Sequence, residues 1–229
     1  MNIFVTGTDT GAGKTVVCAA LLSKLKNENP FYYKPIQTGA VYQNNSYISE
    51  DVETINKLTA SNFSSETSCT YLLKEAVSPL QAAEKENLQI DINKIINQFH
   101  NLQKKHSTII IEGAGGVYVP ITSKLYMFDL ICALNCPAIV VIKPGLGTIN
   151  HTLMTFEVLK KCNIKILGFI VSDYPEETDL VTKENPVIIE KLSGIKCLGK
   201  VFHYVDIAQL SKNLSAGLNY FSDFYPGFP

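Results

Sequence analysis

A lysine and a hydroxyl residue follow a glycine near the N-terminus, in the stretch Gly13-Lys14-Thr15. The loop before them, residues 7–13, is built from small and polar residues, and its glycines allow successive backbone N–H groups to converge on one anion. A lysine in this place can contact the β- and γ-phosphates of a nucleotide, and the threonine hydroxyl can bind Mg²⁺. These residues therefore predict a phosphate-binding loop that opens a helix, whose N-terminus adds partial positive charge.

The first glycine of this loop departs from the usual spacing. The common pattern has four residues between that glycine and Gly-Lys-Ser/Thr, which would place a glycine at position 8, where this chain has Thr8. The glycine is Gly7, so five residues intervene. An ordinary strand–turn–helix is the alternative. The context disfavours it, because an apolar strand is predicted at residues 2–6 and apolar residues recur at helical spacing in residues 16–26.

Lys34 is a second candidate for chemistry. It ends a short aromatic strand predicted at residues 31–34, and it is followed by Pro35 and a turn through Gly39. A side chain at the carboxyl end of such a strand can point into the crevice where open α/β sheets bind their ligands. Lys34 is therefore a candidate ligand contact, and a plain surface lysine is the alternative.

Two carboxylates could complete a metal site. Glu112 ends a continuous β-branched run at residues 108–112, which indicates a strand buried on both faces of a parallel sheet. A carboxylate at the tip of that strand could lie beside the Mg²⁺ of a nucleotide, although a polar strand terminator is the alternative. Asp51 begins a helix predicted at residues 51–58, with Ser49 as its cap. Position alone does not decide whether Asp51 is a helix-start acid or a metal-side carboxylate.

A second glycine-containing segment also precedes a helix. Gly145 and Gly147 come before an apolar helix, so backbone N–H groups near residues 148–150 form another potential anion site. His151 follows directly and could act as a catalytic base. A histidine in a first helical turn is more often a capping or packing residue, and we favour that interpretation.

Strands and helices alternate along the chain, which predicts one doubly wound, mostly parallel α/β sheet with helices on both faces, in a single domain of residues 1–229. Further strands are predicted at residues 138–142, 165–172 and 197–201. Further helices are predicted at residues 79–87, 91–106, 129–134, 152–162 and 187–192. Residues 41–48 and 62–68 are polar and irregular, and they are predicted to be loops.

Composition excludes several classes of partner. The 229 residues carry a net charge of −1, so a sequence-wide basic surface for nucleic acid is absent. No apolar run is long enough to cross a membrane, and we expect no signal peptide before the first strand. The six cysteines form no C-x₂-C pair, and we expect them to be small apolar side chains in a reducing cytosol.

Several motifs together resemble the dethiobiotin synthetase family. A phosphate-binding loop alone is shared by many ATPases, but the combination of KPIQTG, EGAGG and GLGTINH is much more specific. The matching stretches span about two thirds of the chain in the order of the family: VTGTDTGAGKT (5–15), YKPIQTG (33–39), SED (49–51), Ser78-Pro79, EGAGGVYVPIT (112–122) and GLGTINHTLMT (145–155).

The resemblance implies an ATP- and Mg²⁺-dependent cyclo-ligase of biotin synthesis. Such an enzyme takes 7,8-diaminononanoate and CO₂, closes a ureido ring and gives dethiobiotin, ADP and phosphate. One amine captures CO₂ as a carbamate, the carbamate attacks the γ-phosphate, and the second amine attacks the resulting mixed anhydride. The resemblance also implies a homodimer with the substrate site at the interface.

Site residues follow from the match to the family. Lys34 is implied as the catalytic lysine, together with Lys14, and Mg²⁺ would be held by Thr15, Asp51 and Glu112. The implied substrate contacts are Thr10, Thr38, Gly147, Thr148, Ile149 and Asn150. The implied nucleotide contacts are Gly11, Ala12, Gly13, Lys14, Thr15, Val16, Asp51, Glu112, Gly113, Ala114, Gly115, Ser172, Asp173, His203, Tyr204 and Val205.

Three positions depart from the family pattern. Gly11 stands where some members carry a glutamate, so a contact to nucleotide or substrate is lost. Ser172-Asp173 replaces an Asn-Asp pair that often recognises adenine, and His203 replaces a proline beside the base. We therefore hypothesise loose selectivity among nucleoside triphosphates.

Two other functions share this loop architecture. An amidotransferase-type synthase of cobyrinate chemistry would need an additional glutamine-hydrolysing domain, for which this chain is too short. A nucleotide-switch ATPase of the partitioning or cell-division type would have a second lysine early in the loop, where this chain has Thr8. It would also have a basic patch or an amphipathic tail, whereas residues 219–229 are aromatic and carry only Asp223 as a charge.

Overall fold

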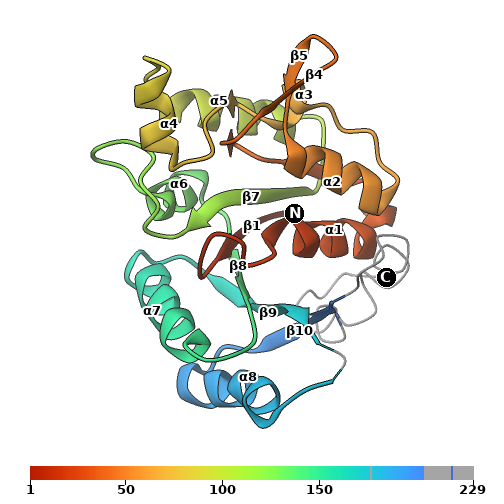
Figure 1. Cartoon of the computed structure of the whole chain (residues 1–229), viewed down its shortest axis with the longest axis vertical. Coiled ribbons are helices and arrows are strands. Elements are labelled where there is room, and N and C mark those ends of the chain that lie inside the picture. The colour runs from red at the N-terminus through yellow and green to blue at the C-terminus, as the bar shows by residue number, and fades with distance from the viewer. Residues whose placement is uncertain (176, 204–217, 219–229) are drawn as a thin grey trace.

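The computed structural model describes residues 1–175, 177–203 and 218. Its centre is a six-stranded sheet in which every neighbouring pair of strands is parallel (Figure 1). In spatial order the strands are β10 (Cys197–Phe202), β9 (Ile166–Tyr174), β8 (Ala138–Ile142), β1 (Asn2–Gly7), β7 (Ile109–Gly116) and β2 (Phe31–Tyr33). The predicted doubly wound parallel sheet is therefore confirmed.

Helices cover both faces of this sheet. Successive side chains of a strand point to opposite faces, so neighbouring residues pack against different helices. Ile3 and Val5 of β1 pack with α1 (Lys14–Lys24) and α2 (Glu50–Thr59), whereas Phe4 packs on the opposite face. On β2, Tyr32 likewise packs on the face covered by α1 and α2, and Tyr33 packs on the opposite face. The core of the second face also includes residues of α4 (Pro79–Lys85), α5 (Ile92–Gln103), α6 (Met127–Leu134), α7 (Thr148–Lys161) and α8 (Leu180–Ser193).

Residues 41–48 are not the irregular loop that their polarity predicted. They form an antiparallel hairpin of β4 (Val41–Gln43) and β5 (Ser46–Ile48). Asn44 and Asn45 turn the hairpin with φ angles of 49° and 64°. Asparagine tolerates the left-handed region that such tight turns require, so the two asparagines are turn residues rather than a sign of irregularity.

Smaller differences concern where elements begin and end. The predicted loop at residues 62–68 contains α3 (Ser65–Ser68), and the Ser64 side chain caps that helix. The first helix begins at Lys14 rather than at residue 16, and it is followed by the short 3₁₀ helix η1 (Lys26–Glu28). Residues 187–192 lie in a helix as predicted; this helix, α8, begins at Leu180, and the Asp179 side chain caps its N-terminus. A small parallel pair, β3 (Ile36–Gln37) with β6 (Tyr71–Leu72), lies beside the main sheet.

Two other expectations bear on the class of protein. Among the described residues, no helix is both long and apolar enough to cross a membrane. Cys18, Cys69 and Cys136 are buried, as expected for small apolar side chains, but Cys132 is exposed. The aromatic segment 219–229 lies outside the described residues.

Candidate active site

The phosphate-binding loop connects the end of β1 to the start of α1. Gly13 is the N-terminal cap of α1, with φ of 87°, and no side chain caps this helix end. A Cβ on Gly13 would lie 1.8 Å from the Ser172 hydroxyl oxygen, so both conformation and space require glycine here. The loop therefore leaves the N–H groups of the first turn of α1 available for an anion.

Lys14 lies within this loop and is almost fully buried. Its ammonium donates a hydrogen bond to the Asp9 carbonyl oxygen at 3.1 Å. Burial lowers the pKa of Lys14, and the nearby Lys34 charge adds to this effect, whereas the Glu112 carboxylate opposes it. The Lys14 charge thus faces a neutral carbonyl, which a phosphate could replace.

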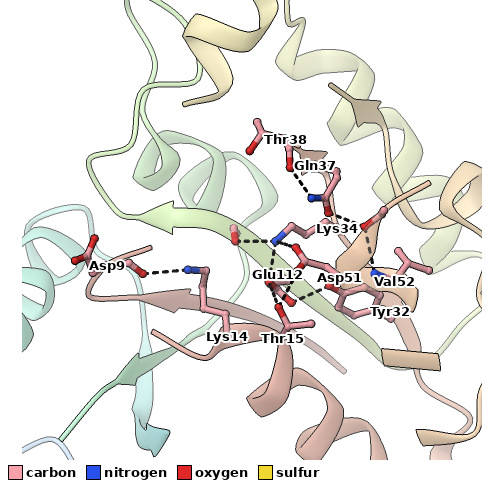
Figure 2. A network of polar contacts seen from close by, with 12 residues as sticks. Asp9, Lys14, Thr15, Tyr32, Lys34, Gln37, Thr38, Asp51, Val52 and Glu112 are labelled. Atoms are coloured by element: carbon pink, nitrogen blue, oxygen red, sulfur yellow. Dashed lines mark hydrogen bonds and ion pairs between the residues drawn. The ribbon is translucent and has the colours of Figure 1, made fainter. Parts of the chain in front are cut away.

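Lys34, Asp51, Glu112 and Thr15 form one compact polar cluster (Figure 2). The Lys34 ammonium lies 2.7 Å from Asp51 Oδ2 and 2.7 Å from Glu112 Oε1. The Thr15 hydroxyl oxygen lies 3.1 Å from Asp51 Oδ1 and 3.0 Å from Glu112 Oε1. Lys34 follows β2, Glu112 lies in β7, and Asp51 and Thr15 lie in the first turns of α2 and α1, so four separate segments converge on one point.

Burial makes this cluster electrostatically strong. The side chains of Lys34 and Glu112 are 6% and 1% exposed, and that of Asp51 is 29% exposed. Burial alone would lower the pKa of Lys34, but the carboxylates of Glu112 and Asp51 raise it above its ordinary value. Burial alone would raise the pKa of Asp51, but the Lys34 ammonium and the Thr15 hydroxyl hold it below its ordinary value. Lys34 and Asp51 are therefore charged at neutral pH.

Tyr32 is a site residue that the sequence reasoning missed. Its hydroxyl donates a hydrogen bond to Glu112 Oε2 at 2.7 Å, from a side chain that is completely buried. Burial raises the pKa of Tyr32 well above its ordinary value, so the hydroxyl remains protonated. The period of two along a strand puts residues 32 and 34 on one face, but the contact to Glu112 also requires the pairing of β2 with β7, which no local pattern gives.

Hydrogen bonds behind the cluster fix the start of α2. The Ser49 hydroxyl accepts from the Val52 N–H at 3.2 Å and donates to Gln37 Oε1 at 2.6 Å. The Gln37 side-chain amide in turn donates to the Thr38 carbonyl at 2.6 Å. These bonds connect the segment that carries Thr38 to the helix that carries Asp51 (Figure 2).

A cavity of about 620 Å³ opens over the loop and the cluster. Its size is that of a site for a small molecule or a nucleotide. Ala12 and Gly113, which the family match also implies, are not among its lining residues. The implied residues that do line it are Thr10, Gly11, Gly13, Lys14, Thr15, Val16, Lys34, Thr38, Asp51, Glu112, Ala114 and Gly115.

The implied substrate residues at the start of α7 lie apart from this cavity. Gly147, with φ of 84°, caps α7, and no side chain caps that helix end. The stretch from Gly147 to Asn150 does not line the 620 Å³ cavity of the described chain. His151 lines a separate cavity of about 460 Å³, together with Asp9, Tyr118 and Met154.

The implied base-binding residues lie at the carboxyl ends of β9 and β10. Ser172 is buried and faces Gly13 of the phosphate loop. Asp173, with φ of 56°, contacts His203 Nδ1 at 2.5 Å and Lys143 Nζ at 3.6 Å. Tyr204 and Val205 lie outside the described residues.

Comparisons with known proteins define the class of the chain. A family model described as an AAA domain matches residues 1–209. The septum site-determining protein MinD from Pyrococcus horikoshii, complexed with Mg-ADP, has a similar fold with a TM-score of 0.57 at 20% identity, over 93% of this chain and 86% of that one. A ParA family ATPase from Chlorobium tepidum gives a TM-score of 0.56 at 13% identity, over 96% and 90%. The fold is thus that of the phosphate-loop ATPases.

Sequence relatives narrow this class. The ATP-dependent dethiobiotin synthetase of Fusobacterium nucleatum is 38% identical, with 85% of this chain and 88% of that protein covered. The protein of the same name from Thermodesulfovibrio yellowstonii is 36% identical, with 86% of each chain covered. The chain belongs to the dethiobiotin synthetase family.

Proposed function

We propose that this chain uses ATP and Mg²⁺ to convert 7,8-diaminononanoate and CO₂ into dethiobiotin, with release of ADP and phosphate. One observation carries the proposal: the Lys34 ammonium lies between Asp51 and Glu112, in a cavity that begins at the phosphate-binding loop. Membership of the family supports the same reaction and its place in biotin synthesis.

The reaction brings two anions together. An amine of the diamine takes up CO₂ and loses a proton, which gives a carbamate. A carbamate oxygen attacks the γ-phosphorus of ATP, and the bond to ADP breaks. The second amine then attacks the carbonyl carbon of the mixed anhydride, the ring closes and phosphate leaves with the electron pair of the broken C–O bond.

The residues of this chain are suited to the second step. The carbamate and the triphosphate repel each other, so cations aimed at the transferred phosphoryl group stabilise the transition state. Lys14 would bind the β- and γ-phosphates, and Lys34 would face the carbamate and the γ-phosphate from the opposite wall. Both ammonium groups are buried, so the charges act in a medium of low dielectric constant.

The donor set fits Mg²⁺. Thr15, Asp51 and Glu112 present hydroxyl and carboxylate oxygens, which Mg²⁺ prefers, and one or two carboxylates plus phosphate oxygens are its usual ligands in nucleotide sites. The described part of the chain has no group of three or more His, Cys, Asp or Glu that could hold a metal by itself. Lys14 and Lys34 only balance the charges of Asp51 and Glu112. When bound, Mg²⁺ would supply the additional positive charge that the triphosphate needs.

The remaining assignments complete the proposal. The chain would act as a single domain, in a homodimer whose partner contributes the α7 segment from Gly147 to Asn150 to the substrate site, in the cytoplasm. The separation of that segment from the cavity within one subunit agrees with a shared site. Thr10 and Thr38 line the cavity and would contact the diamine. Asp173 and His203 would lie beside the nucleobase, together with Ser172, Tyr204 and Val205.

Phosphate release tests this proposal directly. Release from ATP and Mg²⁺ is measured with and without 7,8-diaminononanoate and bicarbonate, and the product is identified by mass spectrometry. We expect release that depends on the diamine, with dethiobiotin as product. Release that is indifferent to the diamine would reject the ligase and favour a nucleotide-switch ATPase.

A further inference from the structure

The two oxygens of the Glu112 carboxylate have different surroundings. Oε1 accepts hydrogen bonds from the Thr15 hydroxyl at 3.0 Å and the Lys34 ammonium at 2.7 Å, so it faces the site. Oε2 accepts from the Tyr32 hydroxyl at 2.7 Å, and the Tyr32 side chain packs in the core between the sheet and helices α1 and α2. Glu112 is only 1% exposed, so the hydrogen bond of Tyr32 does not compete with bulk water.

We propose that Tyr32 is a positioning residue that restricts Glu112 to one site-facing oxygen and thereby favours Mg²⁺ over larger divalent cations. Mg²⁺ requires a compact octahedral shell and takes one oxygen from each carboxylate. Ca²⁺ accepts more ligands and commonly takes both oxygens of one carboxylate. A carboxylate whose second oxygen is already hydrogen-bonded is suited to the smaller ion. The inference rests on the proposed Mg²⁺ site.

Tyr33 offers a matched control on the same strand. Tyr32 and Tyr33 are adjacent and both are 0% exposed, but their side chains pack on opposite faces of the sheet. The Tyr33 hydroxyl contacts Thr70 and the Ile95 carbonyl, away from the cluster. Removing either hydroxyl deletes one buried polar atom from β2, but only the Tyr32 hydroxyl contacts Glu112.

The test measures cation-dependent binding of a non-hydrolysable β,γ-imido analogue of ATP, with Mg²⁺ or Ca²⁺ as the only divalent cation. In Tyr32→Phe we expect Mg²⁺-dependent binding to weaken about 10-fold, as for loss of an outer partner of a metal ligand. Ca²⁺-dependent binding should weaken less or strengthen, so the ratio of Mg²⁺ to Ca²⁺ affinity falls. Tyr33→Phe should lower the melting temperature and leave this ratio unchanged.

A double-mutant cycle gives a second readout. If Tyr32 acts through Glu112, Tyr32→Phe should not change the ratio further in a Glu112→Gln background. An unchanged ratio in a folded Tyr32→Phe variant would overturn the positioning role, and so would an equal fall in Tyr33→Phe. If Glu112→Gln and the unaltered chain bind the analogue equally with Mg²⁺, the proposed metal site itself is wrong. That result is distinguishable from a failure of Tyr32 alone.

Discussion

Two regions at the same edge of the sheet carry charged clusters, and they differ in burial. Beside β7 and β2, Lys34 and Glu112 are nearly inaccessible and their contacting atoms are 2.7 Å apart. Beside β9 and β10, the side chains of Lys143, Asp173 and His203 are 53%, 43% and 56% exposed. Water screens the second cluster, whereas the first acts in a medium of lower dielectric constant.

This difference in burial indicates that the cluster around Lys34, and not the exposed one, is suited to stabilise charge during a reaction. In the buried cluster the hydrogen bonds and ion pairs join four segments that are far apart in the sequence. In the exposed cluster, polar side chains at the ends of three strands meet at the surface, where the net energy of an ion pair is small. Of the departures from the family pattern, His203 lies in the second region, whereas Ser172 is buried against Gly13. The following substitutions test this comparison.

Replacing Lys34 should have the largest effect. In Lys34→Ala we expect kcat to fall by roughly 10²-fold or more, by analogy with loss of one preorganised electrostatic donor, while the ATP analogue still binds. Steady-state kinetics of dethiobiotin formation and analogue binding measure the two quantities. The control is Lys85, a lysine that also forms an ion pair with a carboxylate but lies at the surface. Its ammonium lies 2.9 Å from Glu75, and its side chain is 57% exposed.

Lys85→Ala should leave kcat unchanged, because its ion pair is exposed and lies outside the cavity lining. Equal kcat in Lys34→Ala and in the unaltered chain would remove Lys34 from the mechanism. Loss of Lys34 also leaves Asp51 and Glu112 without their shared cation. Melting curves must therefore show that the variant is folded before its kinetics are interpreted.

Substitutions in the loop separate strain from steric conflict. Gly11 and Gly13 both have positive φ, but a Cβ on Gly11 would meet no atom within 4 Å, whereas one on Gly13 would overlap Ser172. We expect Gly11→Ala to destabilise the fold by about 1 kcal/mol, from backbone strain alone. Gly13→Ala should destabilise it by about 2–3 kcal/mol and abolish analogue binding. Urea unfolding measures the free energy of unfolding of both variants. Equal losses of stability would contradict the steric contact between position 13 and Ser172.

The Lys34–Asp51 pair should give acid-sensitive stability. Because the pKa of Asp51 is lowered in the folded state, its contribution is complete above the ordinary aspartate value of about 3.9 and is lost as pH falls through the lowered value. The difference in unfolding free energy between the unaltered chain and Asp51→Asn, about 1 kcal/mol, should be constant from about pH 5 to 8 and shrink below about pH 4. Measurements in EDTA exclude a contribution from bound cations, and a difference independent of pH would contradict the pairing.

The sequence predicted much of this arrangement, for reasons that are local. Continuous apolar runs located the central strands, and the loop ending at Thr15 located the phosphate site. The rule that ligands bind at the carboxyl edge brought Lys34 and Glu112 into consideration. Asp51 needed the family resemblance, because a first-turn acid looks the same whether it caps a helix or holds a metal.

Other features could not be predicted from local patterns. The Tyr32 contact depends on the pairing of β2 with β7, which places Tyr32 opposite Ile110 and within reach of Glu112, 80 positions away in the chain. The hairpin at residues 41–48 depends on its Asn44-Asn45 turn, which overall polarity concealed. The separation of the α7 start from the cavity depends on the three-dimensional placement of whole elements.

The exposed edge should give the smallest change in stability. His203→Ala removes a contact to a carboxylate that is 43% exposed, so we expect a change below about 1 kcal/mol in thermal or urea unfolding. A larger loss would show that this edge is as tightly organised as the cluster around Lys34, and the comparison would fail.

The same edge makes a prediction about nucleotide choice. Ser172 carries one hydroxyl and is buried behind Gly13, so it cannot present the paired donor and acceptor of a carboxamide. A carboxylate at Asp173 only accepts hydrogen bonds, and every base offers an N–H that can donate one: the amino groups of adenine, guanine and cytosine, and the N3–H of uracil. We therefore expect ATP, GTP and CTP to support similar turnover at matched concentrations. If GTP and CTP gave far lower rates than ATP, adenine would be recognised by residues other than these, and the weak selectivity inferred from this exposed edge would be wrong.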